Sequence, residues 1–295
     1  AADLLASCAT LSGREERLRQ AVAALRDGGV HTFGGASLAM PRGESVRLLL
    51  TLQREPVSGR IYAAALLRTG NNHVFSGGTR HEEAFVAEDP GDCDRVRRDF
   101  VLRLHQILTE LDEYNDGLPW EEQKSLQTYV FDSYEATLLR ELLVDALRDP
   151  AVARAALSLL FYFHSEELVE ADEHPSTEID FPVVVLTDVI RSLMALPIPV
   201  AYRLADVVAA LPPADREPFV YRENDYFSFR LSNALRSDAI HALWHHGKAE
   251  NAERIKRELK MRLWAAWNVV DGIRAAAGDL LFAWPPRFRL PEPAP

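Results

Sequence analysis

Two short apolar segments joined by a tight turn constrain the fold of this chain more than any other feature. The segment 46–53, which ends in the polar step Thr-Leu-Gln, is followed by a Pro-Val-Ser-Gly turn and by a second apolar segment at 61–68. Segments of this length between turn residues are typical of β-strands. A Gly-Asn-Asn turn then precedes a third segment, 73–76, so we expect three strands that pair as an antiparallel meander.

The hydrophobic period changes to that of a helix beyond this meander. Apolar residues recur at helical spacing from Val96 to Leu111. A strand predicted at 126–131 then leads directly into a leucine-rich helix that ends near Leu147. Three strands, a helix, a strand and a helix in this order predict an α/β layer built on a mixed sheet.

The rest of the chain is expected to be mostly helical. Periodicity and stop signals predict helices at 12–27, 185–196, 202–211, 231–243 and 251–277. Because the chain begins without Met and ends in a Pro-rich segment, we expect a piece of a longer polypeptide. The predicted organisation is an N-terminal helix and lead-in (1–43), an α/β core (44–150), a helical region (151–281) and a linker whose aromatic residues dock on a following domain (282–295).

Composition excludes several classes of protein. With 47% hydrophobic residues, the chain can bury a sizeable core. The two cysteines form no CxxC pair, which excludes a disulfide scaffold and a cysteine-rich zinc site. No apolar run approaches membrane-spanning length, so we expect a soluble cytoplasmic protein with no membrane partner. The net charge of −11 restricts any nucleic-acid surface to a local basic patch.

Four short motifs occur in a fixed order along the chain. The first predicted strand ends in Thr-Leu-Gln-Arg-Glu-Pro at 51–56, and the fourth leads into the pair Tyr134-Glu135. A Val-Val-Leu-Thr-Asp-Val-Ile-Arg segment follows at 184–191, and Tyr-Arg-Glu-Asn-Asp stands at 221–225. From Leu18 to Trp244 the chain thereby resembles the RNase H-like, DEDD-type module of the RecB-family nucleases, which precedes a superfamily-1 helicase domain in bacterial and archaeal proteins.

This resemblance implies both a fold and a site. The fold would be an RNase H-like mixed sheet, a three-strand meander plus a further strand, with a large helical C-terminal elaboration that contributes the last motif. In the active family the first strand carries Asp-x-Glu, where this chain has Thr51 and Gln53. Val185 stands at the place of the next acid, and Asp225 matches the last acid. The implied partner is a helicase domain of the same polypeptide.

The missing acids decide the expected activity. Two-metal hydrolysis of a phosphodiester requires several carboxylates that converge on two cations. Mg²⁺ and Mn²⁺ prefer anionic oxygen ligands, which neither Thr51 nor Gln53 nor Val185 supplies. We therefore predict no catalytic residue, no metal and no cofactor. The chain is expected to be a degenerate nuclease-like module that serves as a scaffold or as a binding domain for nucleic acid or protein.

Three alternatives stay open. Thr51 and Gln53 are also compatible with the end of an ordinary strand. A site rebuilt around Asp225 would make the chain a divergent Mg²⁺- or Mn²⁺-dependent 3′–5′ exonuclease; its stand-in carboxylates are Glu55, Asp132 and Asp188. A protein-interaction module would instead bind its partner through acidic loops. The most acidic of these loops is 165–180, which has seven acidic residues and no Lys or Arg. Acidic loops of this kind are more often solvent-exposed segments without a partner.

Two helical segments carry further candidates. The segment from residue 248 to residue 262 contains six basic and three acidic residues. This helix is therefore the candidate surface for single-stranded nucleic acid. The basic residues are Lys248, Arg254, Lys256, Arg257, Lys260 and Arg262. Trp264 and Trp267 follow, and we expect both to pack in the core rather than to stack on bases. His241 and His245 share a helix face, but without a third ligand we expect a solvated helix end.

Overall fold

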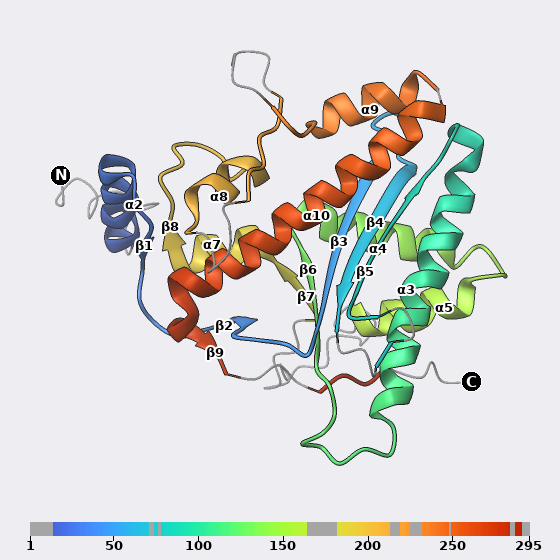
Figure 1. Cartoon of the computed structure of the whole chain (residues 1–295), viewed down its shortest axis with the longest axis horizontal. Coiled ribbons are helices and arrows are strands. Elements are labelled where there is room, and N and C mark those ends of the chain that lie inside the picture. The colour runs from blue at the N-terminus through green and yellow to red at the C-terminus, as the bar shows by residue number, and fades with distance from the viewer. Residues whose placement is uncertain are drawn as a thin grey trace.

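A five-stranded mixed sheet forms the centre of the computed structural model (Figure 1). Strand β3 lies in the middle, with antiparallel β4 and then β5 on one side and parallel β6 and then β7 on the other. The strands are Val46–Arg54 (β3), Ile61–Thr69 (β4), Arg80–Val86 (β5), Leu126–Val130 (β6) and Val183–Val185 (β7). The predicted α/β class with a mixed sheet is confirmed.

The structure describes residues 14–70, 74–75, 78–163, 182–212, 219–224, 232–247, 249–283 and 287–290. Three features singled out in the sequence lie outside these ranges. They are Asp225, Lys248 and the acidic segment 165–180.

Strand β3 is buried on both of its faces, because helices cover both sides of the sheet. Leu48, Leu50 and Leu52 enter one hydrophobic core, and Leu49 enters the other. A strand buried on both faces reads as a continuous apolar run rather than as an alternating one. Burial on both faces therefore explains why Leu48–Leu50 are three consecutive apolar residues.

The helices form one layer on each side of the sheet. One face is covered by α3 (Cys93–Asn115), α4 (Ser133–Ala146) and α5 (Ala153–Phe163). The other face is crossed diagonally by the long helix α10 (Ala249–Ala277), as Figure 1 shows. Although α10 has 29 residues, no helix in the described part of the chain is both long enough and apolar enough to cross a membrane.

Smaller elements surround the α10 side of the sheet. Two short pairings tie the N-terminal lead-in to later segments: β1 with β8, antiparallel, and β2 with β9, parallel. Their bounds are His31–Thr32 (β1), Ser37–Pro41 (β2), Met194–Ala195 (β8) and Leu281–Phe282 (β9). The remaining helices are α2 (Glu15–Asp27), α7 (Leu186–Leu193), α8 (Leu204–Ala210) and α9 (Ser237–His245), with 3-10 turns at Pro90–Asp92 and Gly278–Leu280.

The third strand of the meander lies later in the chain than predicted. Of the predicted strand 73–76, the described residues 74 and 75 are not in a strand, and Phe75 packs under the guanidinium of Arg68 at 3.8 Å. The third strand is instead β5, which begins with the charged sequence Arg-His-Glu-Glu. This sequence is more typical of a loop than of a strand, so the strand was not predicted. Strand β5 lies at the edge of the sheet, where charged side chains reach solvent and discourage further strand pairing.

The helix predicted at 185–196 is also shorter than expected. Residues 183–185 form strand β7 beside β6, and the helix begins only at Leu186. A strand of three residues is too short to show the period of two that identifies a strand. Val185 was therefore assigned to the helix that follows it. The helices predicted at 12–27, 202–211, 231–243 and 251–277 correspond to α2, α8, α9 and α10 with shifted ends.

The expectation that the aromatic tail docks on a following domain is wrong for Phe288. This side chain is only 3% exposed and packs in the core formed by α3, α4 and α5. Asn115 Nδ2 at the end of α3 donates a hydrogen bond to the Phe288 carbonyl at 3.0 Å. Residues 287–290 therefore belong to this folded unit.

A close approach between α10 and the end of α8 yields a first prediction. A Cβ atom added to Gly272 would lie 2.8 Å from Leu211 Cβ, so one of the two segments would have to move. Overpacking typically costs about 1–3 kcal/mol, while alanine in a helix interior gains about 1 kcal/mol over glycine. We expect Gly272→Ala to lower the free energy of unfolding by about 1 kcal/mol, measured by urea denaturation.

Gly278→Ala is the matched control, because a Cβ atom there meets nothing within 4 Å. Its effect should stay within about 0.5 kcal/mol. A stabilising effect of Gly272→Ala would contradict the tight contact with Leu211.

Candidate functional site

Thr51 and Gln53 lie near the end of β3, on the face of the sheet that α10 covers. They alternate with Leu50 and Leu52, which enter the opposite core. Both polar side chains are buried, Thr51 to 3% exposure and Gln53 to 6%. They stand opposite alanines on β4, since Thr51 pairs with Ala65 and Gln53 with Ala63. The structure thus brings the two predicted positions together at one buried location.

Glu135 is the carboxylate that meets Thr51. Thr51 Oγ1 donates to Glu135 Oε1 at 2.5 Å, and the backbone N–H of Phe131 donates to Glu135 Oε2 at 2.9 Å. Asp132 caps the first turn of α4 by accepting from the Glu135 N–H at 2.9 Å, which fixes where Glu135 leaves the helix. Of the Tyr134-Glu135 pair, only Glu135 points inward, because Tyr134 is 55% exposed.

Arg262 brings a positive charge to the same place from α10. Its side chain is only 12% exposed, and its Nη1 lies 3.2 Å from Glu223 Oε1. The same Glu223 oxygen accepts a hydrogen bond from the Tyr221 hydroxyl at 3.2 Å. Arg262 was expected on a nucleic-acid surface, but the structure places it inside. We call Thr51, Glu135, Tyr221, Glu223 and Arg262 the buried charge cluster.

The pKa of Glu135 is perturbed by this environment. Burial, with the nearby charge of Asp132 adding to it, raises the pKa of the carboxyl to about 7. The positive charge of Arg262, the Thr51 hydroxyl and the Phe131 N–H act in the opposite direction and prevent a larger rise. The cluster therefore contains a carboxyl that changes its charge near neutral pH and that protein atoms shield from solvent.

Tyr221 and Glu223 of the last motif belong to this cluster, but Val185 and Asp188 do not reach it. Val185 ends β7, but its side chain packs on the α3–α5 side of the sheet, opposite to Thr51. Asp188 lies on the outer side of α7, exposed and paired with Arg191 at 3.2 Å. Asp225 lies outside the described residues.

The other two stand-in carboxylates have local structural roles. Glu55 accepts hydrogen bonds from the N–H groups of Val57 and Ser58 in the turn after β3. The bonds from Ser58, followed by the one from Val57, lower the pKa of Glu55 to about 2. Asp132 caps α4, as described above. Within the described ranges, no three His, Cys, Asp or Glu side chains are arranged to hold a metal ion.

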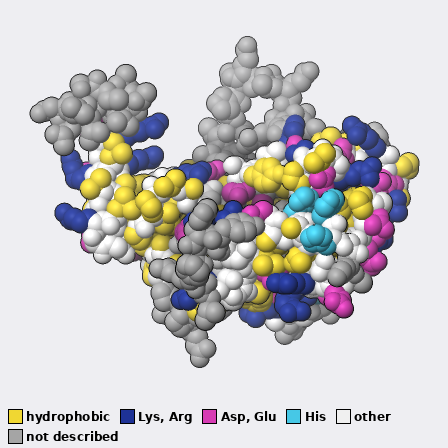
Figure 2. Space-filling model, turned by 90° about the horizontal axis from the view of Figure 1, so that it is seen from above, with side chains coloured by type: hydrophobic (Ala, Val, Ile, Leu, Met, Phe, Trp, Pro, Cys, Tyr) yellow, Lys and Arg dark blue, Asp and Glu magenta, His cyan; other side chains and the backbone are white. Residues whose placement is uncertain are grey.

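The histidines of α9 lie beside the end of β3. The rings of His241 and His245 are 6.1 Å apart, and His241 Nε2 lies 3.7 Å from Glu55 Oε1. Figure 2 shows histidine side chains gathered in one patch, with basic and acidic side chains around it. This face therefore carries charges of both signs.

The predicted basic segment of α10 divides into side chains with different surroundings. Lys256 pairs with Glu253 at 2.7 Å, and Lys260 lies 3.7 Å from Glu82. Arg254 and Arg257 are exposed, and neither forms an ion pair with any residue that the structure describes. Lys248 lies outside the described residues. These two arginines thus present their guanidinium groups to solvent, and Arg257 is close enough to Glu253 to help lower the pKa of that carboxyl.

The expectation that the tryptophans pack in the core is confirmed for Trp267 and in part for Trp264. Trp267 is buried, donates from Nε1 to Asp271 at 2.7 Å and lies 4.2 Å from the guanidinium of Arg47. Trp264 is half-buried and donates to Glu82 at 2.9 Å. Neither indole is free to stack on a base.

Comparisons with known proteins add no family to this description. No protein-family model, no curated protein and no solved structure matches the chain. The function is therefore inferred from the buried charge cluster and its surroundings. Sequence reasoning noted Glu135 and Glu223 within motifs but missed their partner, because Arg262 stands among exposed basic residues of the same helix.

The raised pKa of Glu135 predicts a pH-dependent stability. The folded chain holds this proton more tightly than the unfolded chain, so the contribution is complete below about pH 4.5 and is lost as the pH rises towards 7. Glu135→Gln mimics the protonated carboxyl. Relative to this variant, the wild-type chain should lose on the order of 3 kcal/mol between pH 4.5 and 8, measured by urea denaturation at each pH.

The control for this measurement is Glu121→Gln, at an exposed position. It should leave the shape of the pH profile unchanged. A constant difference between wild type and Glu135→Gln across the pH range would show that Glu135 does not titrate there.

Removal of the internal guanidinium should be far more costly than removal of an exposed one. Arg262→Met leaves Glu223 and the neighbouring carboxyls without their counter-charge, and such a loss costs about 3–5 kcal/mol at buried sites. Arg257→Met, on the exposed side of the same helix, should change stability by less than about 0.5 kcal/mol. Equal effects in denaturant titrations at pH 7.5 would argue against an internal role for Arg262.

Proposed function

We propose that this chain is a non-catalytic, RNase H-like nuclease module of a larger helicase-type protein that processes nucleic acid, in which it serves as a scaffold or binding domain. The element order supports the fold assignment. Three antiparallel strands, a helix, a strand and a helix follow one another as the resemblance implies, and the helical C-terminal half returns α10 to the sheet. The cytoplasmic location and the helicase partner stay predictions from the sequence.

The buried charge cluster carries the proposal on catalysis. A two-metal nuclease directs several carboxylates at one place on its first strand so that two cations bind there. In this chain the corresponding face of β3 offers a hydroxyl and an amide, and the carboxyl that touches Thr51 faces a guanidinium. A fixed positive charge opposes the binding of a divalent cation at the same point. The cluster is suited to holding α10 against the sheet.

The decisive measurement is a nuclease assay on single- and double-stranded DNA and RNA, with calorimetric titration of Mn²⁺ into the same preparation. We expect neither metal-dependent cleavage nor saturable Mn²⁺ binding. Metal-dependent cleavage that is lost in both Glu135→Gln and Asp225→Ala would overturn the proposal and establish the divergent 3′–5′ exonuclease instead. The exposed Glu121→Gln variant separates this outcome from a contaminating nuclease, which no substitution would affect.

A further inference from the structure

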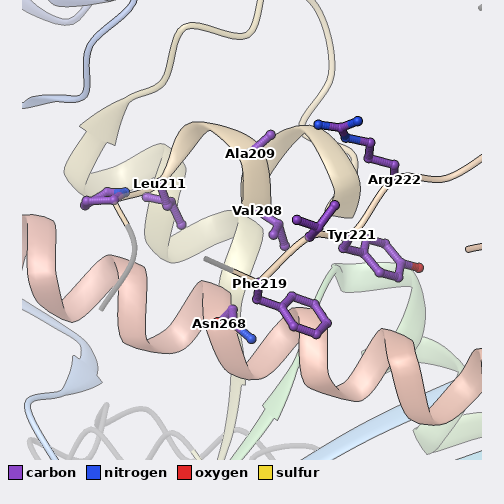
Figure 3. Close-up of a pocket in the computed structure, with 9 residues that line it drawn as sticks. Val208, Ala209, Leu211, Phe219, Tyr221, Arg222 and Asn268 are labelled. Carbon is purple, nitrogen blue, oxygen red and sulfur yellow. The ribbon is translucent and has the colours of Figure 1, made fainter. Parts of the chain in front are cut away.

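A cavity of about 280 Å³ lies beside the buried charge cluster, between α8, the segment 219–222 and α10 (Figure 3). Its walls combine apolar side chains, among them Val208, Leu211 and Phe219, with a nearly equal share of polar surface. Ligand pockets in proteins typically span about 300–1,000 Å³. This cavity is slightly smaller than that range, so it suits one small ring system better than a large cofactor.

The cavity is held in shape by contacts on both sides. Tyr221 forms part of its wall, and its hydroxyl is bound to Glu223, the partner of Arg262. Gly272 of α10 fixes the position of Leu211 through the close approach described above. The rings of Phe219 and Tyr221 are nearly parallel, with an angle of 10° between their planes and 6.5 Å between their centres. They form a preformed aromatic wall.

Two polar side chains accompany this apolar wall. Asn268 lines the cavity from α10, and its Nδ2 is used in a hydrogen bond to the Trp264 carbonyl at 2.7 Å. Its Oδ1 accepts no hydrogen bond from the part of the chain that the structure describes, so it offers an acceptor to a ligand N–H group. Arg222 is exposed at the rim, and its guanidinium points away from the cavity interior in Figure 3.

One face of α10 runs from the cavity past the half-buried Trp264 to the two exposed arginines. Positions 254, 257, 261, 264 and 268 follow one another at alternating steps of three and four, which places them on one helix face. Asn268 and Arg257 are eleven residues apart, or roughly 16 Å along the axis. Arg254 and Arg257 thus lie on the same side of the helix as Asn268, roughly 21 Å and 16 Å from it along the axis.

We propose that single-stranded nucleic acid binds along this face of α10, with one base in the cavity and its phosphates on Arg222, Arg257 and Arg254. The base packs against Phe219, whose ring lies nearly parallel to that of the buried Tyr221, and one of its N–H groups donates to Asn268 Oδ1. Aromatic walls beside a positively charged track are the usual means by which proteins hold single strands. The inference rests on the proposed function, because it supplies the ligand of the binding module.

The test is fluorescence anisotropy with labelled single-stranded DNA and RNA oligonucleotides of about eight nucleotides, at several salt concentrations. Phe219→Leu keeps an apolar side chain but removes the ring, and should weaken binding about tenfold. Asn268→Leu removes the acceptor and should also weaken it. Arg254→Glu with Arg257→Glu should weaken binding further, and loss of the two contacts should make the salt dependence shallower by about 1.4 in log–log slope.

Arg148→Glu is the control, because Arg148 is 81% exposed and follows α4 on the other side of the sheet. It should bind like wild type, and thermal unfolding of every variant identifies any that are misfolded. Binding that depends on the arginines but is unchanged in Phe219→Leu and Asn268→Leu would overturn the base pocket. Absence of binding by the wild-type chain would overturn it as well. Neither result bears on catalysis, which the nuclease assay decides separately.

Discussion

The attachment of α10 to the sheet through buried arginines is the interaction on which the rest of the structure depends. Near the C-terminal end of the helix, Arg274 pairs with Glu44, which also contacts Arg47 at 2.7 Å and accepts from the Tyr129 hydroxyl at 2.6 Å. Arg47 in turn pairs with Asp271 at 2.9 Å. About three turns earlier, Arg262 occupies the buried charge cluster. Because a buried charge without its partner costs several kcal/mol, these contacts determine how α10 lies across β3.

The two clusters differ in how directly their carboxylates are neutralised. Burial alone would raise the pKa of Glu44, but Arg274 and Arg47 in direct contact outweigh it, and the pKa is lowered. Glu135 has only a hydroxyl and a backbone N–H in contact, with Arg262 acting from further away, so burial prevails and its pKa is raised. The first carboxyl is a permanent ion-pair partner. The second changes its charge near neutral pH.

The surroundings of Glu135 provide a physical reason for the proposed loss of nuclease activity. A metal site on β3 would require carboxylates that stay ionised and that face an open space. Thr51 and Gln53 are instead enclosed beneath α10, whose Arg262 supplies positive charge from within the protein. The cavity lies next to the cluster, on the other side of Tyr221, and its lining combines aromatic and aliphatic side chains with Asn268 and Arg222. The proposed binding surface therefore lies beside this enclosed position and not at it.

Local sequence patterns were sufficient to predict the elements whose periodicity extends over many residues. Strands β3 and β4 and helices α3, α4 and α10 were predicted within a few residues, because apolar spacing is a local property. They also determined that Thr51 and Gln53 share one face of a strand. The sequence showed the order of the four motifs, but it did not show which of their side chains lie close together.

Only the tertiary structure decided which side chains meet. Strand β5 is identified only by its pairing with β4 at the edge of the sheet, and β7 only by its pairing with β6. Arg262 and Arg257 lie on one helix and look alike in sequence, yet one faces Glu223 inside and the other faces solvent. Val185 stands at a motif position in the sequence but packs against the opposite core. Burial and charge pairing depend on neighbours that are distant in the chain, and for that physical reason local patterns do not determine them.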